Sequence, residues 1–77
     1  MWKEEDNCLK AEFVFEDFRD AFSFMAEVGI IAEQMNHHPE WTNIYNKVWI
    51  KLSTHSAGNT VTEKDREMAR MIDTLFL

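Results

Sequence analysis

Three histidines are the residues of this chain best suited to moving protons. His37 and His38 are adjacent, and His55, the third and last, follows later in the chain. Imidazole has the unperturbed pKa nearest neutral pH among side chains, so a group of imidazoles can both donate and accept protons near pH 7. The pattern indicates general acid–base catalysis, provided that the segments carrying the histidines end at the same edge of the fold.

Two other interpretations of the histidines stay open. Three imidazoles could supply three ligands of a zinc centre, although consecutive side chains diverge and rarely hold one ion together. The histidines could also be structural, closing the ends of elements and sharing no role. The residue types alone do not decide among the three.

Two carboxylates are spaced to orient the imidazoles. Glu33 lies one helical turn before His37, and the i,i+4 spacing lets its carboxylate hydrogen-bond that ring. The helix dipole also favours a cation at His37, near the C-terminal end of the first predicted helix. Asp65, near the start of the last predicted helix, is placed to orient His55 and fix its tautomer.

The first half of the chain predicts a hairpin followed by a long helix. Trp2–Glu5 could form a short strand, with a turn at Asp6-Asn7. Cys8–Phe15 alternates apolar and polar residues, which is typical of a half-buried strand. Asp17 is placed to cap a helix that runs to about Asn36.

The second half predicts one strand and a second helix. Asn43–Thr54 is interpreted as a single strand with Ile44, Val48, Ile50 and Leu52 toward the core. Residues 56–59 then form a loop, and Thr62 and Asp65 are spaced as a capping pair for the last helix. The predicted order β-β-α-β-α is typical of an α+β fold, a two-layer sandwich with both helices on one face of a small antiparallel sheet.

The long helix carries more apolar surface than one buried face requires. One stripe holds Phe18, Phe22, Met25, Gly29 and Ala32, and a second holds Ala21, Phe24, Val28, Ile31 and Met35. A helix lying on a sheet needs a single stripe about 100° wide. The composition is also 45% hydrophobic, which is rich for so short a chain, so we expect part of the helix to meet another subunit.

The bulk properties exclude several classes of protein. The 77 residues predict one domain, 1–77, and the single cysteine, Cys8, excludes an internal disulfide and a four-cysteine zinc site. A net charge of -6 argues against nucleic-acid binding. The sequence has no apolar run long enough to span a membrane and no signal-peptide core, so we expect a cytoplasmic protein.

The histidines belong to a longer pattern that resembles a known family. The pattern is Glu33-x3-His37-His38-Pro39-x5-Tyr45-x9-His55-x9-Asp65. It is similar to the signature of the pterin-4a-carbinolamine dehydratases, and the resemblance extends from about Trp2 to the last helix.

The resemblance implies a function and a set of site residues. Family membership implies loss of water from 4a-hydroxytetrahydropterin to give quinonoid dihydropterin, which recycles a pterin cofactor. It implies an α+β sandwich, homodimers or homotetramers, and no metal or organic cofactor. The family's catalytic histidines match His37, His38 and His55. We expect substrate binding or site orientation from Glu33, Asn36, Ser53, Thr54, Ser56 and Asp65.

The same resemblance leaves other functions open. Some vertebrate relatives also act as dimerisation cofactors of a homeodomain transcription factor, so a non-catalytic protein-binding role is an alternative. The fold could also act on another pterin. Many relatives carry a helix before the residues that match Trp2, and this sequence begins there. Asn36 stands where aspartate is common, and Lys64 where arginine is frequent.

Overall fold

Four antiparallel strands form a single sheet in the computed structural model, which describes residues 2–76. The strands are β1 (Lys3–Glu5), β2 (Cys8–Val14), β3 (Glu40–Ile44) and β4 (Lys47–Leu52). Their order across the sheet is β1-β2-β4-β3, so β2 and β4 are central and β1 and β3 are the edges.

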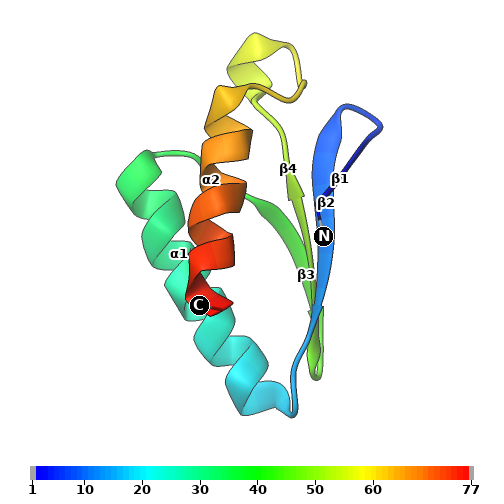
Figure 1. Cartoon of the computed structure of the whole chain (residues 1–77), viewed down its shortest axis with the longest axis vertical. Helices are drawn as coiled ribbons and strands as arrows, with labels where there is room; N and C mark the ends of the chain where they lie inside the picture. The colour runs from blue at the N-terminus through cyan, green and yellow to red at the C-terminus, as the bar shows by residue number, and fades with distance from the viewer. Residues whose placement is uncertain (1, 77) are drawn as a thin grey trace.

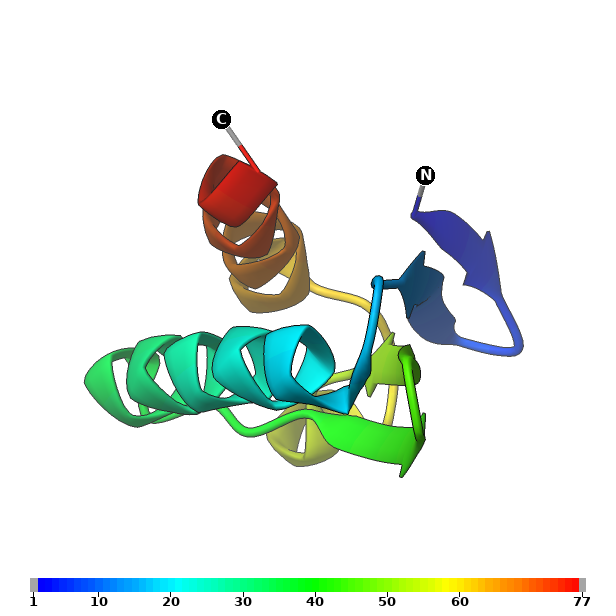
Figure 2. The same ribbon diagram turned by 90° about the horizontal axis from the view of Figure 1, so that it is seen from below.

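Two helices cover one face of the sheet, as Figures 1 and 2 show. They are α1 (Phe18–Met35) and α2 (Glu63–Asp73), and a 3₁₀ turn follows each of β4 and α2, at His55–Ala57 and Thr74–Phe76. The predicted α+β two-layer sandwich is confirmed. The opposite face of the sheet carries the polar residues of the alternating strands.

The core lies between the sheet and the helices. Its buried side chains come from β2, β4, α1 and α2, and are Leu9, Ala11, Phe13, Ala21, Phe24, Val28, Ile31, Ala32, Val48, Ile50, Leu52, Met68, Ala69 and Ile72. Four residues of one predicted stripe of α1 are therefore buried, and so is Ala32 of the other stripe. Phe18 and Phe22 of that other stripe are 47% and 58% exposed.

The predicted strand Asn43–Thr54 is wrong, because the chain turns back within it. β3 and β4 form a hairpin whose turn is at Tyr45 and Asn46, with Tyr45 at a φ of 51°. The Asn43 side chain closes the turn by donating to the carbonyls of Tyr45 at 3.2 Å and Lys47 at 2.9 Å. The observed order is β-β-α-β-β-α, and Ile44, which was expected in the core, is 62% exposed.

The predicted helix caps are confirmed. The Asp17 carboxylate accepts a hydrogen bond from the backbone N–H of Asp20 at 2.9 Å at the start of α1. At the start of α2, the Asp65 carboxylate accepts from the backbone N–H of Thr62 at 2.9 Å, which completes a capping box. Within residues 2–76, neither helix is long and apolar enough to cross a membrane.

Candidate functional site

Three chain segments meet at one end of the sandwich and enclose a small pocket. They are the turn after α1, the segment after β4 and the first turn of α2. The pocket has a volume of about 240 Å³. Its lining residues are Asn36, His37, His38, Ser53, Thr54, His55, Ser56 and Lys64. The structure therefore brings together all three histidines and four of the six residues expected beside them. The other two, Glu33 and Asp65, do not line the pocket.

The end of α1 places His37 at this pocket. Asn36 adopts a left-handed conformation, with a φ of 51°, and the helix stops there. The backbone N–H of His37 then donates to the carbonyl of Ala32 at 3.0 Å, which fixes the turn. His37 is only 9% exposed, so its ring lies inside the fold.

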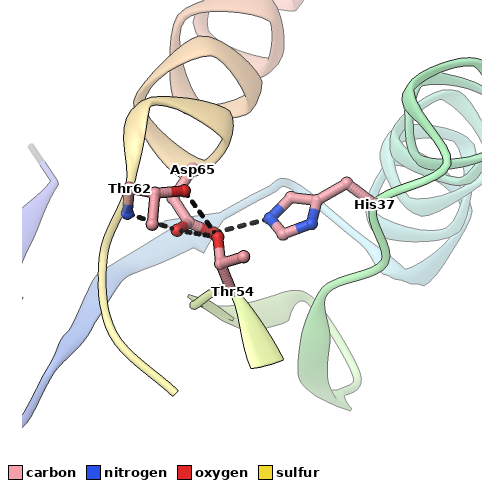
Figure 3. A network of polar contacts seen from close by, with 4 residues as sticks. All are labelled: His37, Thr54, Thr62 and Asp65. Atoms are coloured by element: carbon pink, nitrogen blue, oxygen red, sulfur yellow. Dashed lines mark hydrogen bonds and ion pairs between the residues drawn. The ribbon is translucent and has the colours of Figure 1, made fainter. Parts of the chain in front are cut away.

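His37 is held by a buried carboxylate on α2. Its Nε2 lies 2.6 Å from Oδ1 of Asp65, which is fully buried (Figure 3). The hydroxyl of Thr54 donates to the other carboxylate oxygen at 2.8 Å, and the hydroxyl of Thr62 lies 2.7 Å from that of Thr54. Since the single Thr54 proton is directed to Asp65, the Thr62 hydroxyl is the donor to Thr54.

The environment of Asp65 favours its ionised form. Burial alone would raise the pKa of this carboxyl, but hydrogen bonds from the backbone of Thr62 and the side chains of His37 and Thr54 outweigh it, and the pKa is lowered. Asp65 is therefore a carboxylate at neutral pH, and Nε2 of His37 carries the hydrogen that it donates.

The second ring nitrogen of His37 remains accessible. Nδ1 takes part in none of the side-chain hydrogen bonds among residues 2–76, and no buried side-chain nitrogen or oxygen among these residues lacks a partner. Nδ1 is therefore not sealed within the core. In the neutral ring with hydrogen on Nε2, this atom is an acceptor, so His37 can take a proton from a molecule in the pocket.

The segment after β4 brings His55 to the pocket. The backbone N–H of Thr54 donates to the carbonyl of Thr60 at 2.9 Å, which holds this segment in place. The chain then makes the 3₁₀ turn His55–Ala57 and reverses at Gly58, whose φ of 82° suits glycine. His55 is consequently exposed beside Thr54, with no hydrogen bond from its ring to the residues described.

Comparison with known proteins shows which family this chain belongs to. The sequence profile described as pterin 4 alpha carbinolamine dehydratase matches residues 1–75. The chain belongs to that family. A relative from Prochlorococcus marinus (strain MIT 9515), provisionally named pterin-4-alpha-carbinolamine dehydratase, is 48% identical over 75 residues, or 97% of this chain and 77% of the relative. A relative of the same name from Paraburkholderia xenovorans (strain LB400) is 51% identical over 69 residues, covering 90% of this chain and 71% of its own length.

A solved structure also matches this dehydratase-family chain. It is described as a transcriptional coactivator/pterin dehydratase from Brucella melitensis and is 45% identical, with a TM-score of 0.89. The match covers 95% of this chain and 79% of the other. The similarity confirms the family resemblance that the histidine pattern predicted.

Two predicted carboxylate contacts in this family member are wrong. Asp65 was expected to orient His55, but it hydrogen-bonds His37, because the turn at Asn36 swings that ring toward α2. Glu33 was expected to contact His37, but its Oε1 lies 3.1 Å from Nε2 of His38. The i,i+4 rule fails here because the helix has already ended when the chain reaches His37.

The pocket also contains residues that the sequence did not single out as ligands. Lys64 lines it from the first turn of α2, directly before Asp65. A second pocket of about 320 Å³ adjoins it and shares His38, Ser53 and His55. Glu40 and Lys51 line that second pocket, and only the hairpin, which the sequence did not predict, brings them together.

The histidines do not form a metal centre with their neighbours. Among residues 2–76, no three His, Cys, Asp or Glu side chains are grouped so that they could hold a metal ion. His37 already directs Nε2 to Asp65, and His38 and His55 are exposed. The donor set therefore fits proton transfer better than zinc binding.

Proposed function

We propose that this protein is a hydro-lyase that dehydrates 4a-hydroxytetrahydropterin to quinonoid dihydropterin, so that the pterin can be used again. The observation that carries the proposal is the pocket lined by three imidazoles, one of which is hydrogen-bonded to a buried, ionised carboxylate. Family membership supports the substrate class.

The reaction requires one acid and one base. The bond between C4a and the hydroxyl oxygen breaks, and that oxygen leaves as water after it receives a proton. The proton on N5 passes to a base, and its electron pair forms the C4a=N5 double bond. The acid ends deprotonated and the base protonated, and exchange with solvent restores both. Two imidazoles in opposite protonation states can do this near neutral pH.

His37 and His55 are our first candidates for the two proton transfers. Nδ1 of His37 can accept a proton, and the Asp65 carboxylate stabilises the imidazolium that results. His55 also lines the pocket and is exposed, so solvent can return its proton after each turnover, which suits the acid. His38 is our candidate for holding the hydroxyl or the ring, with Glu33 as its hydrogen-bond partner.

The other lining residues are proposed to position the substrate. A pterin ring presents donors and acceptors along its edge, and Asn36, Ser53 and Ser56 offer side chains of both kinds around the pocket. Thr54 is a positioning residue, because its hydroxyl is already committed to Asp65. Asp65 acts in the same way, through His37.

The test is stopped-flow measurement of 4a-carbinolamine dehydration by ultraviolet absorbance. Wild type should accelerate the reaction, and His37→Ala and His55→Ala should each lose about 10²–10⁴-fold if they transfer protons. Lys47→Met, an exposed change at the far end of β4, is the control and should keep wild-type rates. A well-folded wild type without any acceleration would remove the proposal.

We also propose that the protein assembles as a homodimer or homotetramer through the exposed apolar side of α1. Phe18, Phe22 and Ile30 are 47%, 58% and 55% exposed on this helix, and Phe18 stacks on Phe22 with ring centroids 5.8 Å apart. Burying these side chains against a second copy would remove them from water. Light scattering should show an oligomer for wild type and a smaller species for Phe22→Asp.

A second candidate function is protein binding without catalysis. The same exposed side of α1 favours it, and the Brucella melitensis relative is described as a coactivator as well as a dehydratase. The variant His55→Ala distinguishes the two functions, because His55 lies in the turn after β4 and not on α1. A protein that acted only by binding would tolerate His55→Ala, whereas a dehydratase would not.

A further inference from the structure

The second pocket adjoins the histidine pocket and has no role in the proton transfers. It is lined by His38, Pro39, Glu40, Lys51, Ser53 and His55. Three of these residues, His38, Ser53 and His55, also line the first pocket, so the two spaces share a wall. A substrate whose reacting atoms lie against the histidines can extend from one space into the other.

The chemistry of the proposed substrate determines which part of the pterin can extend into the second pocket. C4a and N5 must lie at the histidines, since the hydroxyl leaves one and the proton leaves the other. C6 is bonded directly to N5, so its substituent must project from the ring beside the reacting atoms. The second pocket shares His38 and His55 with the first, so it is a space that the C6 substituent can reach.

Glu40 and Lys51 give that space its polarity. They are direct cross-strand partners on β3 and β4, on the face of the sheet away from the helices. Oε2 of Glu40 and Nζ of Lys51 are 4.0 Å apart, which is longer than a hydrogen bond, and the side chains are 78% and 48% exposed. The pair is loose enough for a hydroxyl to lie between a donor and an acceptor.

We infer that Glu40 and Lys51 form a subsite for a hydroxylated C6 substituent, and this rests on the proposed dehydratase function. A hydroxyl both donates and accepts, so it can satisfy the Glu40 carboxylate and the Lys51 ammonium together. An anionic substituent would be repelled by the Glu40 carboxylate and by the overall charge of -6. An alkyl substituent would find only Pro39 as an apolar neighbour among the lining residues.

The experiment compares two synthetic carbinolamines that differ only in the C6 substituent, 1,2-dihydroxypropyl and methyl. Wild type should have the higher kcat/KM for the dihydroxypropyl substrate. Lys51→Met should reduce that preference about three- to tenfold, the effect of losing one partly exposed hydrogen bond, and leave the methyl substrate within about twofold of wild type. Glu40→Gln should reduce the preference in the same direction, with a smaller effect because the amide oxygen still accepts.

Lys47→Met is the matched control, because Lys47 lies on the same face of β4 at its other end. It should leave the preference unchanged. Equal kcat/KM for the two substrates in wild type, or a preference that survives Lys51→Met, would overturn the subsite while leaving the dehydratase function in place. An equal loss for both substrates in Lys51→Met would also overturn it, since Lys51 would then act on the ring chemistry. No acceleration of either substrate by wild type would remove the proposed function and the subsite with it.

Discussion

Replacing Asp65 with asparagine should destabilise the fold far more than changing any exposed carboxylate. The buried Asp65 carboxylate accepts hydrogen bonds from the Thr62 backbone at 2.9 Å, the Thr54 hydroxyl at 2.8 Å and His37 at 2.6 Å. Bonds to a charged group contribute about 1.5–3 kcal/mol each. In Asp65→Asn the oxygen still accepts from Thr62 and Thr54, but the amide N–H₂ faces the N–H of His37.

Asparagine can relieve that donor–donor contact only if His37 moves its hydrogen from Nε2 to Nδ1. We therefore expect a loss of about 2–3 kcal/mol in the free energy of unfolding, from weakened bonds to Thr62 and Thr54 and the imposed tautomer. Urea unfolding at pH 7, followed by tryptophan fluorescence, measures it. ¹⁵N chemical shifts of His37 report the tautomer separately from stability.

Glu33→Gln is the matched control for Asp65→Asn. It also removes a carboxylate from a histidine, but the side chains of Glu33 and His38 are 84% and 60% exposed. Exposed ion pairs contribute about 0–1 kcal/mol, so this variant should unfold close to wild type. A cost for Asp65→Asn no larger than that for Glu33→Gln would refute the interpretation of Asp65 as the anchor of the site.

The cost of Asp65→Asn should also depend on pH. The pKa of Asp65 is lower in the folded protein than its usual value of 3.8. The carboxylate therefore contributes its full stability above that usual value, and the contribution is lost as the pH falls through the folded pKa. The difference between wild type and Asp65→Asn should shrink as the pH falls below about 5, because the carboxylate that makes these bonds becomes protonated in the wild type. A difference that stays constant down to pH 2 would contradict this linkage.

Variants at two further residues, Asn36 and Asn43, check the turns that build the fold around the pocket. Asn36→Ala should cost about 1 kcal/mol, because alanine tolerates the left-handed φ of 51° less well than asparagine does. Asn36→Gly should cost much less, because glycine has no Cβ, and thermal unfolding compares the two. A larger loss for glycine than for alanine would contradict that cause. Asn43→Ala should cost about 1–2 kcal/mol, since its side chain donates to two carbonyls of the β3–β4 turn, whereas Gln34→Ala, on the exposed side of α1, tests the effect of deleting an exposed amide. Urea unfolding with no difference between these last two variants would show that the hairpin does not need the amide.

The elements that the sequence predicted well are those with local signals. Alternation predicted a strand at Cys8–Phe15, where β2 spans Cys8–Val14, and the cap residues Asp17 and Thr62 marked the starts of both helices. The missed hairpin had a weaker signal, since Tyr45-Asn46 contains neither glycine nor proline and Asn46 alone did not divide the apolar run. Its turn depends on the Asn43 side chain, which bonds backbone carbonyls on both sides of it.

The grouping of the histidines was less predictable than their identity. The sequence indicated which residues could transfer protons, and the family pattern connected them. The pairing of His37 with Asp65 rather than Glu33 depends on the left-handed turn at Asn36. A helical wheel continued past that residue assigns the wrong carboxylate, because helical spacing no longer applies after the helix ends.

Asp65 connects the stability of the fold to the geometry of the pocket. One carboxylate oxygen accepts the Thr62 N–H that opens α2 and the Thr54 hydroxyl after β4, while the other holds His37 after α1. The three segments that enclose the pocket are thus tied to one buried charge, and His38 and His55 project from the anchored segments into solvent. Protonating Asp65 would loosen all three ties together, so the orientation of His37 should be lost over the same acidic range as the stability that Asp65 contributes.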